Sequence, residues 1–383
     1  MRFGRFLTVW ICSLFIFSCS SSKKLTRNEV PLGTIRFVNA LTVPNGKIFA
    51  GTMVGGLSGI DYDAKKNIYY MICDDPSAFN PARYYTARIA IGPNGIDSVI
   101  FLKVDSLRDR DGKLYPDIRK DRVHSADLEA LRYDPLRNEM AWSSEGQRVI
   151  NDSTQQLQDP AIVITDINGH YKDSFALPVN MHMHDQPRGP RHNSVLEGLS
   201  FDEDGSHVYV SVEEPLYEDG PKAGTGDSTA VIRILKFNRK LKQCVAQYGY
   251  RIDPIPYPAV PAGAFKINGV SDILYLGHDK FIVIERAYST GRIPTDIKLY
   301  LADASHAEDV TDVASLNTYA GPGLISKRLL FDMNKEIPFD IFNVEGVTLG
   351  PPLSNGHRSL VLVTDNNFNA REKTQFFLFE VIP

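Results

Sequence analysis

Acidic residues recur at a regular interval along this chain, each near the start of an apolar segment. They are Glu129 in LEALRYD, Glu197 in LEGLSFD, Asp272 in VSDILYL and Glu345 in VEGVTLG, and Ser58 in LSGIDYD holds the corresponding place in a first copy. Successive positions lie 68 to 75 residues apart. If these copies surround one axis, four carboxylates meet in a small region, where they repel one another unless a cation joins them or some take up protons.

Carboxylate oxygens are hard ligands that suit Ca²⁺ and, less well, Mg²⁺. The sequence therefore predicts a Ca²⁺ site whose ligands come from Glu129, Glu197, Asp272 and Glu345. The alternative is that each acid only accepts hydrogen bonds from backbone amides at the start of a strand. The recurrence of the acids in successive copies favours the metal site.

Basic side chains gather in the segments that lead into these positions. His124 and His192 each stand five residues before the acid of their copy, Arg191 and Lys266 lie in similar approaches, and Arg286 ends the fourth hairpin. A cation beside such residues suits phosphate-ester hydrolysis, because the cation activates water and the basic groups hold the non-bridging oxygens. These five residues are therefore candidate catalytic residues, with solvated or ion-paired loop side chains as the alternative.

The elements that must position these side chains are hairpins. Each acid opens a first strand that is followed by a turn and a second apolar strand, as in LEGLSFDEDGSHVYVSVEE. The second strands end in Asp75, Glu145, Glu214, Arg286 and Asn366. Repetition at this period, in units of several strands without helical periodicity, predicts a β-propeller.

Two further strand-like runs follow each hairpin except the last, which gives five four-stranded blades; six would require that a long insertion hides one. The fifth hairpin is followed only by TQFFLFEVIP, and we expect TIRFVNALTV at Thr34–Val43 to supply the missing outer strand. Pairing of the two chain ends would then close the ring. The loops at 107–127 and 178–195 lead into the inner strands, so functional side chains are expected on that face.

The first residues are typical of a secretory signal. Arg2 and Arg5 precede an apolar run that is too short to span a membrane, and IFSC ending at Cys19 resembles a bacterial lipobox. The sequence predicts a protein of the bacterial cell envelope, facing the periplasm or the surface and bound to the membrane by acyl chains on Cys19; an ordinary signal peptide is the alternative. The expected segments are a signal peptide at 1–18, a tether at 19–33 and the propeller at 34–383.

The composition sets limits on function and pairing. A net charge of −4 and a pI near 6.2 argue against nucleic-acid binding, and 43% apolar residues in 383 allow a large core. We expect a monomer. Cys73 and Cys244 fall in different units, so separate thiols are favoured over a disulfide.

Several of these motifs together resemble the phytase-like propeller family known as "esterase-like activity of phytase". They are GGLSGIDYD, HSADLEALRYDP, HNSVLEGLSFDEDGSHVYVSVEEPL, NGVSDILYL with FIVIER, and NVEGVTLG with LVLVTDNNF. The resemblance implies a secreted or envelope-located β-propeller that acts on phosphate or other esters with calcium. The Glu-Gly openers are also similar to those of calcium-dependent lactonase propellers.

The leading hypothesis is a metal-dependent hydrolase of a small-molecule phosphoester or ester. Ca²⁺ held by the acids would lower the pKa of a bound water, His124 or His192 would carry the proton, and Arg191, Arg286 and Lys266 would grip phosphate. A lactonase or carboxylesterase using the same metal is one alternative. A lipid-anchored binding propeller without catalysis, whose acids are structural, is another.

Overall fold

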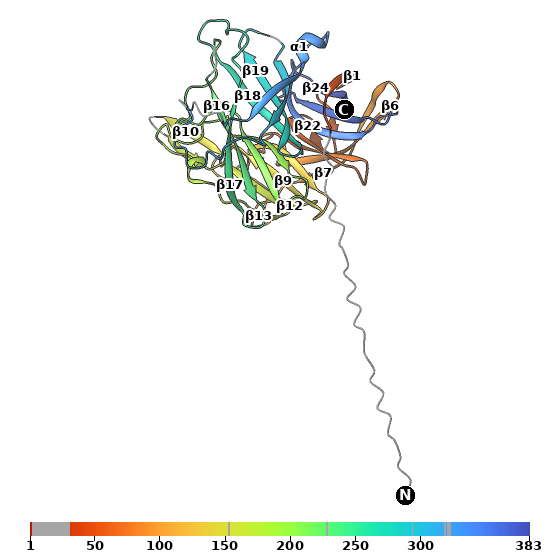
Figure 1. The fold of residues 1–383 in the computed structure, drawn as a ribbon, viewed down its shortest axis with the longest axis horizontal. Helices are drawn as coiled ribbons and strands as arrows, with labels where there is room; N and C mark the ends of the chain where they lie inside the picture. The colour runs from red at the N-terminus through yellow and green to blue at the C-terminus, as the bar shows by residue number, and fades with distance from the viewer. Residues whose placement is uncertain (2–30, 152–153, 227–228, 293, 318, 320–322) are drawn as a thin grey trace.

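The computed structural model describes residue 1 and residues 31–383, apart from 152–153, 227–228, 293, 318 and 320–322. Five four-stranded antiparallel sheets form the blades of a β-propeller (Figure 1). The innermost strand of each blade contacts the innermost strands of the blades on both sides, and the last of these contacts closes the ring. The prediction of five blades is therefore confirmed.

The blades follow one another along the chain, and in blades 1 to 4 the inner strand comes first in the sequence and the outer strand last. Blade 1 consists of β4 (Leu57–Asp63), β5 (Ile68–Cys73), β6 (Arg83–Gly92) and β7 (Gly95–Ser106). Blade 2 consists of β8 (Leu128–Asp134), β9 (Glu139–Ser144), β12 (Ala161–Asp166) and β13 (Tyr171–Ser174). Blade 3 consists of β14 (Leu196–Phe201), β15 (His207–Val212), β16 (Val231–Asn238) and β17 (Gln243–Arg251).

Blade 4 consists of β18 (Lys266–Gly277), β19 (Lys280–Ser289), β20 (Asp296–Asp303) and β21 (Ser326–Asp332). Blade 5 consists of β22 (Asn343–Pro352), β23 (Arg358–Asp365), β24 (Thr374–Ile382) and, outermost, β1 (Thr34–Val43). The N-terminal strand thus completes the C-terminal blade, as predicted, and β1 lies beside β24 in Figure 1.

The remaining described elements are short. Two hairpins lie outside the blades, β2 (Ile48–Phe49) with β3 (Thr52–Met53) and β10 (Gln147–Asn151) with β11 (Thr154–Gln158). The helices are a 3₁₀ turn at Val179–Met181 and α1 at Met333–Glu336. Neither described helix is long and apolar enough to cross a membrane.

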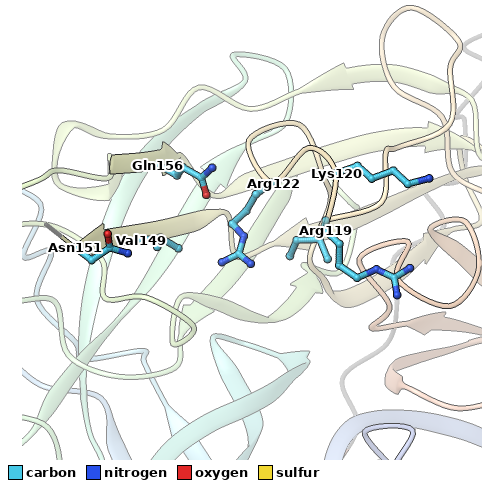
Figure 2. Close-up of a pocket in the computed structure, with 7 residues that line it drawn as sticks. Arg119, Lys120, Arg122, Val149, Asn151 and Gln156 are labelled. Atoms are coloured by element: carbon cyan, nitrogen blue, oxygen red, sulfur yellow. The ribbon is translucent and has the colours of Figure 1, made fainter. Parts of the chain in front are cut away.

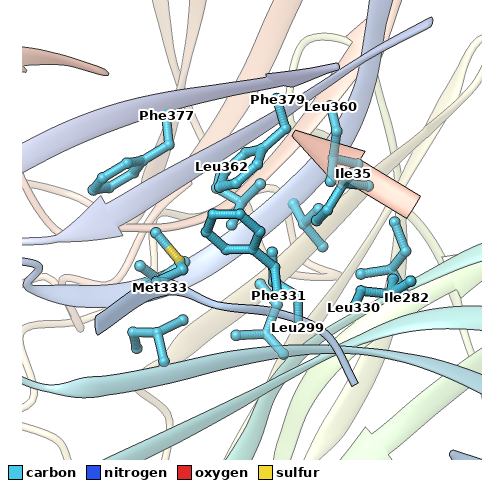
Figure 3. Close-up of a cluster of buried hydrophobic side chains, with 14 of the residues drawn as sticks. Ile35, Ile282, Leu299, Leu330, Phe331, Met333, Leu360, Leu362, Phe377 and Phe379 are labelled. Atoms are coloured by element: carbon cyan, nitrogen blue, oxygen red, sulfur yellow. The ribbon is translucent and has the colours of Figure 1, made fainter. Parts of the chain in front are cut away.

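The core is divided among the interfaces between neighbouring blades, because a strand of period two buries apolar side chains on both faces when a blade packs on each side. Figure 3 shows the interface between blades 4 and 5, where Leu299 and Phe331 pack against Phe377 and Phe379. Similar clusters fill the other four interfaces. Cys73 and Cys244 are free thiols on different blades.

The five inner strands run in the same direction along the channel, so the propeller has two different faces. We call the face where they begin the entry face and the face where they end the exit face. In the terminal blade Thr34 pairs with Ile382, and Val43 pairs with Thr374, which places both chain ends on the exit face. Cys19 lies outside the described residues, and its lipidation stays a prediction.

Candidate metal centre

Each inner strand carries a β-bulge near its beginning, and the bulge positions the acids. In β4 the extra residue is Ser58, and in β22 it is Glu345. The irregularities in β8 and β14 fall at Glu129 and Glu197. A bulge redirects its side chain out of the regular alternation, and here it brings three of the four predicted acids to the entry end of the channel.

Glycine follows the bulged residue where neighbouring inner strands come closest. A Cβ on Gly198 would lie 2.5 Å from the backbone nitrogen of Ile273, and one on Gly59 would lie 2.8 Å from that of Leu131. Such distances leave no room for a side chain, so the glycine after the bulge has a packing cause both in the Ser58-Gly59 pair and in the Glu197-Gly198 pair.

The fourth predicted acid lies elsewhere. The bulged residue of β18 is Ser271, so the sequence alignment that placed Asp272 at this position was one residue out of register. Arg132 donates from Nη2 to both carboxylate oxygens of Asp272, at 2.9 and 2.7 Å, and Val347 N donates to the same carboxylate. Asp272 is therefore part of a buried ion pair rather than of the acidic group at the entry end.

A second ring of acids, which the repeat pattern did not place on the axis, comes from the residues that directly follow or end the second strands. It consists of Asp74, Glu145, Glu213 and Asp365, with Arg286 at the corresponding place in blade 4. The acid that recurs at the end of the second strand in blades 1, 2, 3 and 5 was the available signal. Asp127, one residue before β8, adds a further carboxylate.

These side chains form one group, which we call the acidic cluster. Its members are Asp74, Asp127, Glu129, Glu145, Glu197, Glu213, Glu345 and Asp365. One carboxylate oxygen each of Asp74, Asp127 and Glu129 lie within 4.8 Å of one another, and the same holds for Glu129, Glu145 and Glu197. Glu129 therefore belongs to both groups.

Burial and mutual repulsion raise the pKa values of the acids in the cluster, so these acids keep their protons to a higher pH. Burial, reinforced by Asp127 and Glu213, raises the pKa of Glu145 to about 8, and burial with the charge of Asp365 raises the pKa of Glu345 to about 8. Burial likewise raises the pKa of Glu213 to about 7 and, with neighbouring acids, that of Glu129 well above its usual value. At neutral pH several members are thus protonated unless a cation compensates their charge.

Arg286 is the basic side chain within this group. Its guanidinium donates to Glu213 Oε1 at 2.6 Å and lies 3.8 Å from Glu345 Oε1. Burial alone would lower the pKa of Arg286, but the surrounding carboxylates raise it above its ordinary value. One guanidinium cannot compensate eight carboxylates, so the cluster either keeps part of its protons or takes up a cation.

The donor set fits a hard divalent cation. Glu345 Oε2 and Asp365 Oδ2 are buried and have no hydrogen-bond partner among the described residues. A buried carboxylate oxygen without a partner is costly, and coordination to Ca²⁺ would satisfy it. Three or more oxygens within 4.8 Å of one another, with a shared Glu129, suit the coordination of one or two such ions.

The predicted basic residues lie in different environments. Arg191 donates to the carbonyl oxygens of Pro215 and Gly220, both at 2.7 Å, and its guanidinium lies 4.4 Å from the Tyr217 ring centre, so it holds the 215–220 loop. His124 is 76% exposed and binds Asp121. Lys266 is half-buried at the start of β18, before the bulge.

His192, the other predicted proton carrier, lies near several cationic side chains. Its pKa is lowered by burial and by the charges of Arg122, Arg148 and Lys222. Lys222 pairs with Glu214, the residue next to Glu213, so His192 lies near the entry rim of blade 3. The imidazole is therefore neutral at neutral pH and able to accept a proton.

The channel is blocked below the cluster. The Arg132–Asp272 pair crosses it, and beyond this pair the exit end opens into a separate cavity of about 670 Å³, which we call the exit pocket. The exit pocket is lined by the ends of the inner strands, including Asp61, Asp134, Phe201, Leu274 and Thr348. The acidic cluster lies on the entry side of this pair.

Comparisons with known proteins agree with this architecture. A family model described as "Phytase-like: Esterase-like activity of phytase" matches residues 52–368. No curated protein matches the sequence significantly.

Solved structures with some similarity are of low sequence identity. An α-L-arabinofuranosidase from Lactobacillus brevis is 11% identical, covers 85% of this chain and 91% of its own, and has a TM-score of 0.44. An exo-β-1,3-galactanase from Phanerochaete chrysosporium is 12% identical, covers 88% and 64%, and has a TM-score of 0.45. These similarities are too distant to say anything about function.

Proposed function

The chain belongs to the phytase-like family described as esterase-like activity of phytase, and from this premise we propose that it is a metal-dependent hydrolase of phosphate esters. The family suggests an esterase-like hydrolase on a propeller. The observation that carries the finer proposal is the acidic cluster, whose carboxylates are buried, crowded and in part without hydrogen-bond partners among the described residues. Such an arrangement supports a role for Ca²⁺ as the resident cation.

The residues that would hold Ca²⁺ are those of the two close groups, with Glu129 common to both. When bound, a divalent cation polarises the ester and lowers the pKa of a bound water. Glu345 and Asp365, each with an oxygen that no described residue contacts by a hydrogen bond, lie in blade 5 beside blade 1 and would complete the ligand set. Asp272 is left out of this set because Arg132 already compensates its charge.

The protein groups around this centre would orient and neutralise the substrate. Arg286 is fixed by Glu213, and its Nε is buried without a partner among the described residues, so it can face an anionic oxygen of the substrate. His192, whose pKa is lowered by burial and by its cationic neighbours, would accept a proton on the entry rim. Arg191 would act indirectly by holding the 215–220 loop.

The position of the chain ends supports an orientation for the predicted envelope lipoprotein. Because Thr34 begins β1 on the exit face, a tether from Cys19 would leave from that side. The entry face with the acidic cluster would then point away from the membrane surface, where soluble esters are accessible.

Calorimetric titration with Ca²⁺, combined with hydrolysis of 4-nitrophenyl phosphate, tests the proposal. Glu129→Gln should weaken Ca²⁺ binding by at least about 100-fold and remove turnover, since loss even of a residue that only supports a ligand costs 10–100-fold. Glu203→Gln is the matched control, because Glu203 lies in the exit pocket and accepts hydrogen bonds from Tyr275 and His278.

The outcomes separate the candidate functions. Ca²⁺-dependent turnover of 4-nitrophenyl acetate or of a lactone, without phosphatase activity, would favour a carboxylesterase or lactonase at the same cluster. Ca²⁺ binding without turnover of any of these esters would favour a binding propeller. Unchanged Ca²⁺ binding in Glu129→Gln would contradict the assignment of the metal centre.

A further inference from the structure

The exit pocket, the cavity of about 670 Å³ at the exit end of the channel, has no part in the proposed hydrolysis. Every blade contributes to its wall, mainly through the end of its inner strand and the turn that follows. Most of the wall is apolar or aromatic, with Phe201, Leu274, Tyr275 and Leu349 among the lining residues. A cavity of this size with an apolar wall and a few polar groups is typical of a site for a small molecule.

The mouth of the exit pocket lies on the exit face. Lys65 and Leu136, in the hairpin turns after β4 and β8, line the pocket and are exposed. At the opposite end the buried Arg132–Asp272 pair lies across the channel. The exit pocket and the acidic cluster are therefore on opposite sides of this pair, and the exposed part of the exit pocket is on the exit face.

The charged groups of the exit pocket are predominantly acidic. Its wall contains two basic residues, Lys65 and Arg358, and five acidic ones. The acidic ones are Asp61, Asp63, Asp134, Asp202 and Glu203. Asp134 and Asp202 contact basic side chains, and Glu203 accepts two hydrogen bonds. The excess of carboxylates over basic groups favours a cation in this pocket.

Among the described residues, Asp61 has only neutral partners. Its Oδ2 accepts a hydrogen bond from the backbone nitrogen of Tyr133 at 2.8 Å, and its Oδ1 accepts one from Thr348 Oγ1 at 2.9 Å. Asp61 is 5% exposed and forms no ion pair with any residue in the described part of the chain. A carboxylate oxygen can accept two hydrogen bonds, so each oxygen of Asp61 has a free acceptor position.

Asp63 stands two residues beyond Asp61 on β4, so the two carboxylates lie on the same face of the strand. Its Oδ1 accepts hydrogen bonds from the backbone nitrogens of Lys65 and Lys66, whereas its buried Oδ2 has no hydrogen-bond partner among the described residues. Lys66 Nζ lies 3.1 Å from this oxygen, on a side chain that is 44% exposed. Buried acceptors of this kind are costly unless a donor reaches them, and an ammonium group supplies three donors.

A second cavity has the opposite charge. It has a volume of about 330 Å³ and lies beside the β10–β11 hairpin on the entry side of blade 2 (Figure 2). Arg119, Lys120 and Arg122 line it, and none of its lining residues is acidic. Such a surface repels a cation, so an organic cation should distinguish the exit pocket from this cavity.

We propose that the exit pocket binds a small organic cation, an amine whose ammonium group pairs with Asp61 and Asp63 and whose apolar body lies against Phe201 and Leu274. The carboxylates supply charge and hydrogen-bond acceptors, and the wall supplies apolar contact. Neither an inorganic cation nor a neutral apolar molecule uses both. The inference does not depend on the proposed hydrolase activity, because the buried ion pair across the channel separates the exit pocket from the acidic cluster.

Two benzophenones that differ in charge test this proposal. 4-(Aminomethyl)benzophenone carries an ammonium group at neutral pH, whereas 4-(hydroxymethyl)benzophenone has a neutral hydroxyl group on the same aromatic body. Both are titrated by calorimetry into the protein with excess Ca²⁺, which competes with the amine for the acidic cluster. The amine should bind at least about tenfold more tightly than the alcohol, and Asp61→Asn should reduce this ratio to less than about twofold.

Glu129→Gln is the matched control, because it removes a carboxylate from the acidic cluster and leaves the exit pocket intact. Its affinity for the amine should equal that of the unchanged protein to within about twofold. Amine binding that is weakened in Glu129→Gln and not in Asp61→Asn would place the amine at the acidic cluster and overturn the proposal. Equal affinities of the unchanged protein for the amine and the alcohol would also overturn it.

Photochemical labelling locates the amine without any substitution, so the test stands even if Asp61→Asn does not fold. On irradiation the benzophenone carbonyl inserts into a nearby C–H bond of the protein, where its carbon forms a C–C bond and its oxygen takes up the hydrogen. Mass spectrometry should find the label on the walls of the exit pocket, in the segments 61–65, 134–136, 201–205, 274–277 and 348–349. A label that lies elsewhere, or no binding of the amine, would overturn the proposal.

Discussion

The two ends of the propeller channel both carry many carboxylates, but the carboxylates are paired at the exit end and largely unpaired at the entry end. At the exit end the acids have partners: Asp134 pairs with Arg239, Asp202 pairs with His207, and Asp61 accepts a hydrogen bond from the backbone nitrogen of Tyr133. At the entry end eight acids share one arginine, and two of their oxygens are buried with no hydrogen-bond partner in the described part of the chain. The number of partners, rather than the number of acids, distinguishes a structural turn from a functional site.

The electrostatic consequences follow the same division. Although burial opposes it, Arg239 and Arg137 lower the pKa of Asp134 at the exit end. At the entry end burial and neighbouring acids raise the pKa of Glu197 well above its usual value. Both residues belong to inner strands, so the difference comes from what surrounds each end and not from the strand itself. Between them the Arg132–Asp272 pair separates the two environments.

The largest effect that would test this contrast is the dependence of stability on pH. The acids of the cluster have higher pKa values in the folded state than in the unfolded state. Their contribution to the free energy of unfolding is therefore fully present below about pH 4.5 and is lost as the pH rises through about 8. Summed over several groups, the metal-free protein should lose on the order of 5 kcal/mol of unfolding free energy between about pH 5 and pH 8.

Urea unfolding at each pH measures this loss, and Ca²⁺ provides the control. Added Ca²⁺ should restore stability most strongly at about pH 8, because metal binding to protonated carboxylates must release their protons. Stability of the metal-free protein that rises steadily over the same pH range would show that the entry-end acids are compensated like those of the exit end.

The next largest effect concerns the ion pair that separates the two ends. Arg132→Met leaves Asp272 buried without its counter-ion and should destabilise the protein by about 3–5 kcal/mol, as measured by urea unfolding. The double variant Arg132→Met with Asp272→Leu removes both charges and should recover most of that loss. A cost below about 1 kcal/mol for the single variant would mean that water or another group compensates Asp272.

The sequence predicted the fold more completely than the site, and the physical reasons differ. Five repeated hairpins and the closing strand at Thr34–Val43 follow from apolar alternation, which is a local property. The positions of Glu129, Glu197 and Glu345 followed from the same repetition. The position of Asp272 did not follow from it, because the bulge of β18 falls on Ser271, one residue earlier. A shift of one residue does not change the apolar pattern of the sequence, but it places the side chain of Asp272 on the other face of the strand.

Other parts of the site depend on tertiary contacts that no local pattern reveals. Glu145 and Glu213 directly follow strands whose orientation toward the axis is set by the blade as a whole. The β10–β11 hairpin is polar and lacks apolar alternation, so the pocket beside it was not anticipated. The partners of Arg191 lie 24 and 29 residues away, in a loop that packs against it only in the folded chain.

The smallest effect is the most direct comparison of the two ends, because it makes the same kind of change at each. Asp134→Asn removes the charge that Arg239 and Arg137 compensate, and should cost about 1–3 kcal/mol. Glu197→Gln removes a charge that its neighbours repel, and in the metal-free protein at about pH 8 it should leave stability unchanged or raise it by up to about 1 kcal/mol.

The two variants can be compared by urea unfolding in the presence of a chelator. Changes of opposite sign in the free energy of unfolding would establish that a carboxylate stabilises the fold at one end of the channel and opposes folding at the other. Ca²⁺ should reverse the order, since Glu197→Gln then loses a ligand while Asp134→Asn is unaffected. A loss of similar size in both variants without Ca²⁺ would mean that Glu197 is held by hydrogen bonds, as an ordinary acid at a strand start would be, and the entry end would lose its distinction.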